Sequence, residues 1–265
     1  MFSVLFFVFF VVLFFHHKEH KEEHKEHKKV NSMLAIQHLT RSLSHLFFPH
    51  ICSGCGTDIL SDHTFLCARC ISELPVTNFH LHANNAVEKI FWGRIPLVNA
   101  SSFCYFSKDS LVQRLLHELK YKGNKELGIQ MGKLSGSMLR SSNRFNDIDC
   151  LIPLPLFAAK ERIRGYNQAS VLCNGMAGSM NIPVYEKAIV RPGATSTQTH
   201  KNRIERWENI EGKFLLADKE SLINKHVLLV DDVVTTGATL EACGHELLKV
   251  EGLKLSIATF AYTVL

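Results

Sequence analysis

Hydrophobic residues after position 100 fall into two patterns, short continuous runs and sets spaced by three or four positions. The runs are typical of strands buried on both faces of a sheet, and the spaced sets are typical of amphipathic helices. The runs predict strands over residues 102–106, 148–152, 184–191, 227–230 and 255–264. The spaced sets predict helices over residues 111–119, 125–139, 167–180 and 239–250. Because strands alternate with helices, we expect a three-layer α/β domain with a mainly parallel sheet.

Polar residues follow directly after the strand expected at 227–230. Asp231 and Asp232 follow it, at the carboxyl end where open parallel sheets bind their ligands. A turn with hydroxyls and a glycine then leads into the next helix, through Thr235, Thr236, Gly237, Ala238 and Thr239. Backbone amides at a helix N-terminus can hold one phosphate, and two adjacent carboxylates suit the vicinal hydroxyls of a ribose, directly or through Mg²⁺. The segment therefore predicts a sugar-phosphate site.

Three other interpretations of this segment are weaker. A strand that ends in solvated acids before an ordinary turn does not explain three threonine hydroxyls around one glycine. A receiver domain would carry its paired acids near its beginning, whereas these lie near the carboxyl end of the sequence. A P-loop nucleotide hydrolase would carry the pattern G-x-x-x-x-G-K-[ST], which is absent from the sequence.

Two Cys-x-x-Cys pairs precede the α/β pattern. Cys52 and Cys55 form the first, and Cys67 and Cys70 form the second after eleven intervening residues. This spacing is typical of a structural zinc ion with four sulfur ligands and no open coordination position. Disulfides are disfavoured because no export signal is visible, and a redox function would need only one pair. The other cysteines are scattered and are expected in the core, at Cys104, Cys150, Cys173 and Cys243.

Cations lie at three places where an anion could bind. Lys120 and Lys122 end one predicted helix; their spacing favours a solvated terminal turn over a phosphate contact. The segment Lys160–Gln168 carries three cations around a glycine, and it fits an anion site and a solvated loop equally well. The polar segment 192–207 predicts a lid over a site. Residues 79–100 show no clear pattern and are expected to be a connector.

The beginning of the sequence differs in composition from the rest. The apolar run Phe2–Phe15 is shorter than the about 20 residues of a spanning helix, and it lacks the features of a secretory signal. His16–Lys29 contains only His, Lys and Glu. Metal binding by this tract and a short membrane anchor stay open. We expect residues 1–32 to be a disordered or non-native extension, with Met33 as the functional start, no stable membrane span from residue 33 onward and a cytoplasmic location.

Composition places the remainder among globular proteins. The 265 residues are 46% hydrophobic and 21% charged, which excludes a chain disordered throughout and a collagen-like fibre. The net charge of +5 permits anionic ligands without indicating nucleic acid.

Several motifs together resemble the ComF family of phosphoribosyltransferase-fold proteins. Besides the four cysteines and Val227–Thr239, the resemblance includes Lys120-Tyr-Lys-Gly123, Ile152-Pro-Leu-Pro155, Arg164-Gly-Tyr-Asn-Gln168 and Gln198-Thr-x-Lys201-x-Arg203-x-x-Arg206-Trp-x-Asn209. It covers nearly all of residues 45–265. It implies a type I phosphoribosyltransferase fold over 100–265 and a zinc ribbon over 45–80.

The resemblance also implies roles for individual residues. Asp231 and Asp232 would hold the ribose hydroxyls of phosphoribosyl pyrophosphate (PRPP), and residues 235–239 would bind its 5′-phosphate. Arg162 and Arg164 would face the pyrophosphate. Lys201 and Arg203 would lie in the loop that closes over the site. These four cations are the candidate catalytic residues; no general base is assignable.

Two classes of function follow. The first is an enzyme that binds PRPP with Mg²⁺ and transfers the phosphoribosyl group to a nitrogen nucleophile, with a place in competence and DNA uptake. The second is a non-catalytic module of the same fold that contacts a DNA-uptake helicase or single-stranded DNA. A PRPP sensor without turnover is a third possibility. PRPP binding in the presence of Mg²⁺ distinguishes the first and third from the second.

Overall fold

The computed structural model describes residues 51–58, 60, 64–192 and 214–264. The expected extension over 1–32 and the polar segment with Lys201 and Arg203 lie outside the described residues. Within the described residues, no helix is long and apolar enough to cross a membrane.

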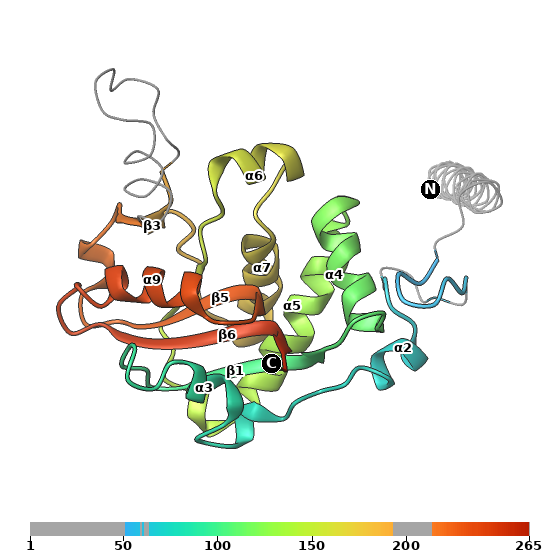
Figure 1. Ribbon diagram of the computed structural model, residues 1–265, viewed down its shortest axis with the longest axis horizontal. Coiled ribbons are helices and arrows are strands. Elements are labelled where there is room, and N and C mark those ends of the chain that lie inside the picture. The colour runs from blue at the N-terminus through green and yellow to red at the C-terminus, as the bar shows by residue number, and fades with distance from the viewer. Residues whose placement is uncertain (1–50, 59, 61–63, 193–213, 265) are drawn as a thin grey trace, which may run out of the picture. The chain divides into compact units, whose positions relative to one another are not determined.

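A four-stranded parallel sheet forms the centre of the domain (Figure 1). Its strands lie in the order β1 (Ala100–Phe106), β6 (Lys254–Thr263), β5 (His226–Val234) and β2 (Cys150–Pro153). The two inner strands are buried along most of their length, as their continuous apolar runs predicted. Because all four strands run in one direction, their carboxyl ends share one edge of the sheet.

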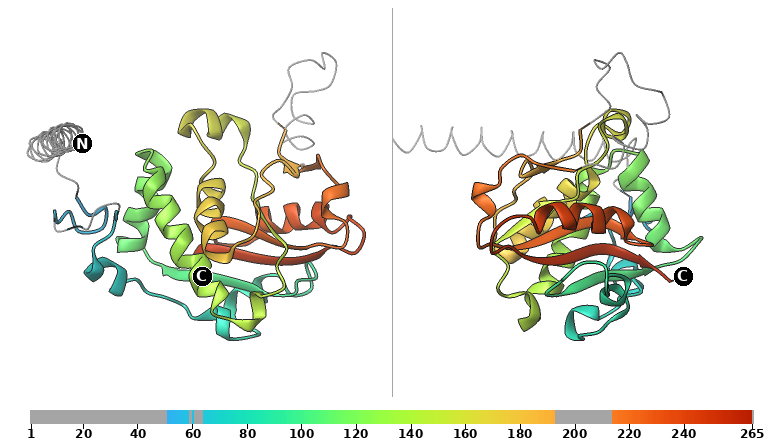
Figure 2. Two further views of the ribbon diagram at one scale, coloured as in Figure 1. Left: turned by 180° about the vertical axis from the view of Figure 1, so that it is seen from behind. Right: turned by 60° about the vertical axis from the view of Figure 1, so that its left-hand side comes forward.

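Helices cover both faces of this sheet, and Figure 2 shows the arrangement from two further directions. The bundle on one face consists of α4 (Leu111–Tyr121), α5 (Lys125–Arg140) and α7 (Gln168–Met180). The opposite face carries α9 (Ala238–Leu247) and the short α3 (Ala86–Ile90). The expected three-layer α/β fold with a mainly parallel sheet is confirmed.

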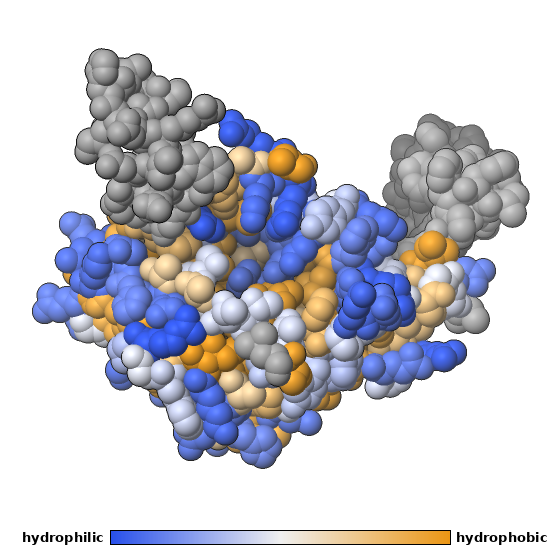
Figure 3. Space-filling model, viewed as in Figure 1, coloured by the Kyte–Doolittle hydropathy of each residue, from blue (hydrophilic) through white to orange (hydrophobic). Residues whose placement is uncertain are grey.

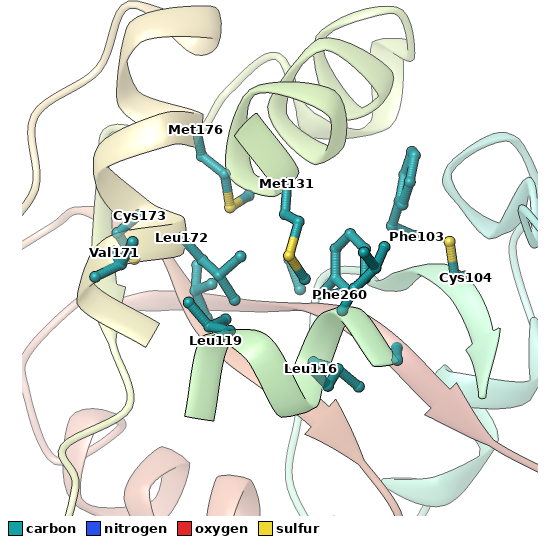
Figure 4. Packing of buried hydrophobic residues seen from close by; sticks show 14 of the residues in the cluster. Phe103, Cys104, Leu116, Leu119, Met131, Val171, Leu172, Cys173, Met176 and Phe260 are labelled. Carbon is teal, nitrogen blue, oxygen red and sulfur yellow. The ribbon is translucent and has the colours of Figure 1, made fainter. Parts of the chain in front are cut away.

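The core under the helix bundle is close-packed. Leu119 of α4, Met131 of α5, Leu172 of α7 and Phe260 of β6 belong to one buried cluster (Figure 4), and each of them is at most 2% exposed. The backbones of α5 and α7 approach so closely that a Cβ on Gly132 would lie 2.2 Å from the Leu172 carbonyl oxygen. This contact fixes α7, whose N-terminus lies next to the carboxyl end of β2.

Three expectations about local structure are wrong in detail. The connector over 79–100 contains η1 (Phe79–Leu81) and α3, which are too short to produce a periodic pattern. The strand expected at 184–191 is reduced to a bridge at Val184 and to β3 (Ile189–Val190), which pairs with β4 (Leu215–Leu216). The loop expected around Arg162 and Arg164 is helical, as α6 (Ala158–Arg164).

The remaining elements are short. They are α2 (Ala68–Ser72), which follows the third ligand candidate Cys67, and the two 3₁₀ turns η2 (Asn143–Phe145) and η3 (Glu220–Leu222).

Candidate functional site

The two adjacent acids lie at the carboxyl end of β5, as the sequence predicted. Neighbouring side chains on a strand point to opposite faces, and Asp232 turns toward the helix bundle. There its Oδ2 lies 3.0 Å from Nζ of Lys120 on α4. Asp231 turns toward the other face, and its Oδ1 accepts a hydrogen bond of 2.8 Å from the backbone amide of Asp232. The acid pair is therefore held by its own backbone and by one ammonium group.

Burial raises the pKa of the Asp231 carboxyl, and the neighbouring Asp232 raises it further. The Asp232 amide and the cations Lys120 and Arg164 oppose this rise, and the pKa of Asp231 settles at about 8. A carboxyl with such a pKa exchanges a proton near neutrality and can donate or accept a hydrogen bond. Both are useful where a ligand offers hydroxyl groups.

The turn after β5 is open to solvent. Thr235, Thr236, Ala238 and Thr239 are exposed, and Gly237 is buried with φ of +73°. The amides of residues 235–237 donate to no other residue within the described part of the chain. Amide donors and hydroxyls thus surround the N-terminus of α9, which is the arrangement that holds a phosphate.

Gly237 is required by what lies behind the turn. A Cβ there would lie 2.7 Å from Cγ2 of Ile90 and 2.8 Å from Cε1 of Phe91. Its positive φ also disfavours any other residue. The C-terminal end of α3 therefore supports the turn from its buried side.

Arg94 ties that segment to the turn. Its Nη1 donates to the carbonyl oxygens of Ile90, at 3.1 Å, and of Thr236, at 2.8 Å. Its Nη2 forms an ion pair with Glu241 in the first turn of α9. Sequence reasoning missed Arg94 because it lies in the segment without periodicity, 142 positions from Thr236.

The structure corrects the expectation for Lys120 and leaves that for Lys122 intact. The Lys120 side chain is 23% exposed and paired with Asp232, whereas Lys122 is 61% exposed and pairs with Glu118 of its own helix. The two lysines point in different directions, because residues two positions apart on a helix are rotated by about 200°. Only the packing of α4 against the sheet decides which lysine faces the acids.

Arg164 and Arg162 differ in the same way. Nη1 of Arg164 donates to Oε1 of Gln168 at 2.6 Å, and its guanidinium lies 5.7 Å from the centre of the Tyr121 ring. Arg162 is exposed. The space-filling view shows a mostly hydrophilic surface over α6 and the end of α4 (Figure 3). Arg164 is thus held close enough to act on the charge of Asp231, whereas Arg162 faces solvent on a helix without buried residues.

The four cysteines come together as their spacing predicted. Their Sγ atoms all lie within 4.8 Å of one another, and those of Cys55 and Cys67 are 3.7 Å apart. Tetrahedral zinc with Zn–S bonds of 2.3 Å needs sulfurs about 3.8 Å apart, so the cluster fits the ion. The amides of Gly54 and Cys67 donate to Sγ of Cys52, at 3.4 and 3.3 Å. Although burial opposes it, these donors lower the pKa of Cys52 to about 6, which favours a thiolate.

Local sequence explains the compactness of this cluster. A Cβ on Gly54 would lie 2.7 Å from Sγ of Cys70 and equally close to Leu111. Cys67 caps α2 by accepting the amide of Cys70 on its sulfur. The other four cysteines are buried, as expected for core residues.

Comparison with known proteins agrees with this geometry. Residues 167–263 match the family model of the phosphoribosyl transferase domain. The chain is 30% identical over 203 residues to the DNA utilization protein YhgH of Escherichia coli O157:H7, covering 75% of this chain and 84% of that protein. It is 28% identical over 201 residues to competence protein F of Haemophilus influenzae, covering 74% of this chain and 83% of that protein.

Solved structures of low similarity also match. Glutamine PRPP amidotransferase from B. subtilis has a TM-score of 0.37 at 16% identity, and the match covers 53% of this chain and 30% of that one. The extent of the sequence match to competence protein F and its relatives, together with the phosphoribosyl transferase domain, shows that the chain belongs to the ComF family.

Proposed function

We propose that this protein binds PRPP together with Mg²⁺ and transfers its phosphoribosyl group to a nitrogen nucleophile. The observation that carries this proposal is the acid pair Asp231–Asp232 next to an open, amide-lined turn at the N-terminus of α9. The two features are separated by only two residues, Val233 and Val234, so one ligand with a phosphate and vicinal hydroxyls can reach both.

Each part of the ligand has a partner of suitable chemistry. The 5′-phosphate accepts hydrogen bonds from the amides and hydroxyls of residues 235–239. The ribose hydroxyls lie at the carboxyls of Asp231 and Asp232. The diphosphate then lies toward the cations at the ends of α4 and α6. The acid pair supplies the oxygen ligands that Mg²⁺ prefers, and Mg²⁺ would neutralise charge on the departing diphosphate.

In the reaction, the bond between C1′ and the diphosphate oxygen breaks and a bond from C1′ to nitrogen forms. The electron pair of the broken bond leaves with the diphosphate, and the nitrogen releases its proton to solvent. Positive charge develops on the ribose ring, next to the carboxylate of Asp232. Protein cations stabilise the charge that develops on the leaving group.

Isothermal calorimetry with PRPP and Mg²⁺ tests binding. We expect the double variant D231N/D232N to lose affinity, while D218N keeps it, because Asp218 is an exposed acid away from the turn whose carboxylate accepts the amide of Ser221. Binding by the wild type that survives in the double variant would contradict the assigned site. A wild type without affinity would contradict the proposed function. Release of diphosphate in the presence of a panel of nitrogen bases then separates an enzyme from a sensor.

The names of the relatives support a role in DNA utilization and competence. We propose a cytoplasmic location and a part in DNA uptake. The competing function is a non-catalytic module that binds single-stranded DNA or a DNA-uptake helicase. The cation and aromatic group formed by His117, Tyr121 and Arg164 supports contact with a single strand, because the ring centres of His117 and Tyr121 are 4.9 Å apart. DNA binding that is unchanged in D231N/D232N and insensitive to PRPP, in a protein without diphosphate release, would favour the module.

The four-cysteine cluster is proposed to hold a structural zinc ion. We propose no chemical step at this ion, because four thiolates fill a tetrahedral site.

A further inference from the structure

The ammonium of Lys120 is built into the acid site. Its Nζ lies 3.0 Å from Oδ2 of Asp232, and the two side chains are 23% and 11% exposed. An ammonium has three N–H donors, and one of them is directed to Asp232. The remaining donors lie beside the acid pair, in a side chain that solvent still reaches.

The position of Lys120 is fixed by the end of its helix. The preceding residue, Leu119, is fully buried, and its carbonyl oxygen accepts a hydrogen bond from the hydroxyl of Tyr166. Nζ of Lys125 lies 5.0 Å from the centre of the same tyrosine ring. The last turn of α4 is therefore anchored to the segment between α6 and α7, and Lys120 is not a freely moving surface lysine.

Without this cation, the site would repel the ligand that it is proposed to bind. The acid pair suits ribose hydroxyls, but the negative charge of Asp232 opposes a diphosphate on C1 of the same sugar. Lys120 neutralises Asp232 and offers donors on the side where the diphosphate lies. The 5′-phosphate is bound without a contact to Lys120, because the amides of residues 235–239 donate hydrogen bonds to it.

We propose that Lys120 is a specificity-determining residue that makes the site prefer ribose 5-phosphates carrying a diphosphate on C1 over ribose 5-phosphate itself. This inference rests on the proposed function and adds to it the residue that distinguishes the two ligands. Lys122, two positions further along, has no part in it, because it pairs with Glu118 at 2.7 Å.

The test compares two ligands on matched lysine variants. Affinities for PRPP with Mg²⁺ and for ribose 5-phosphate with Mg²⁺ are measured by calorimetry on the full chain, for wild type, K120M, K120Q, K120R and K122M. The loss of a charge-assisted hydrogen bond predicts an affinity for PRPP about ten-fold or more weaker in K120M and K120Q. Affinity for ribose 5-phosphate stays the same or rises in both. K120R keeps most of the preference, and K122M keeps all of it.

Several results would overturn the inference. If K120M and K120Q weaken both ligands equally, Lys120 has only a structural role; thermal unfolding of each variant shows whether the fold is intact. If a well-folded K120Q prefers PRPP over ribose 5-phosphate as strongly as the wild type does, the role of Lys120 is overturned. The proposed function is not affected by that result. A wild type that binds neither ligand overturns the proposed function and this inference together. If K120M does not fold, K120Q decides between these outcomes, since it keeps a polar side chain of similar length.

Discussion

The guanidinium of Arg94 donates a hydrogen bond of 2.8 Å to the carbonyl oxygen of Thr236, in the turn that follows the two acids. The same side chain pairs with Glu241, so that one residue from outside the matched domain, residues 167–263, connects the turn to the helix that follows it. A carbonyl held in this way fixes its peptide plane, so that the amide of Gly237 points away from Arg94. The contact makes Arg94 a positioning residue for the proposed phosphate site.

Replacement of Arg94 is therefore expected to weaken binding without a contact to the ligand. We expect R94M to bind PRPP and ribose 5-phosphate roughly three- to ten-fold more weakly, to a similar degree for both. K89M is the control, because Lys89 lies on α3 next to Trp92 rather than at the turn. Calorimetry measures both variants. An R94M affinity equal to that of the wild type would show that the turn keeps its shape without the contact to Arg94.

Gly237 provides a test of how tightly the turn is supported. G237A would combine a positive φ of +73° with contacts of 2.7 and 2.8 Å to Ile90 and Phe91. We expect it to lose roughly 2–4 kcal/mol of unfolding free energy. G165A has a similar φ of +78° but open space around its Cβ, so it should lose only roughly 1–2 kcal/mol. Urea unfolding compares the two, and equal losses would mean that the Ile90 and Phe91 contacts do not matter.

The raised pKa of Asp231 predicts how stability depends on pH. The folded protein keeps a proton on Asp231 that the unfolded chain releases above about pH 4, until the pH passes the folded value of about 8. Asp231 therefore contributes most favourably below pH 4, and its contribution is lost progressively as the pH rises to about 8.

Thermal unfolding of D231N across this range checks the dependence. Relative to wild type, D231N should gain stability steadily from pH 5 to pH 8, because an amide has no proton to lose. D218N, which changes an exposed acid, should show no such trend. A D231N difference that is constant with pH would mean that the carboxyl titrates normally.

The cysteine cluster predicts a metal content. Purified protein should contain about one equivalent of zinc per chain, and C67S should lose the ion together with several degrees of thermal stability. C104A is the control, since Cys104 is a buried core residue that does not belong to the four-cysteine cluster. It should be less stable than wild type but keep its zinc. Full zinc content in C67S would be incompatible with four-sulfur ligation.

The parts of the site that sequence predicted are those made by consecutive residues. The buried run 227–230, the two acids and the glycine-containing turn follow one another, and their chemistry is visible without knowledge of packing. The four cysteines could be predicted for a similar reason, because the two members of each Cys-x-x-Cys pair are close in sequence and are joined by a short segment. The buried strands and most helices were predicted for the same reason, since their apolar periods are local.

The contacts that sequence did not predict join distant segments. Lys120 meets Asp232 across 112 positions, and the choice between Lys120 and Lys122 depends on the rotation of α4 against the sheet. Arg94 and Tyr166 act through backbone carbonyls, which carry no sequence signal. Helices of five to seven residues, such as α3 and α6, contain fewer than two turns and are too short for a period to appear.

The order of strands has a consequence for biosynthesis. β6 lies between β1 and β5, yet it is the last element made among those described. While the ribosome is still producing the preceding residues, β1 has no partner on that side and the apolar edge of β5 is uncovered. The nascent chain must therefore keep these surfaces from aggregating until residue 263 has emerged, and a premature stop before β6 would leave β1 without its strand partner rather than a smaller complete sheet.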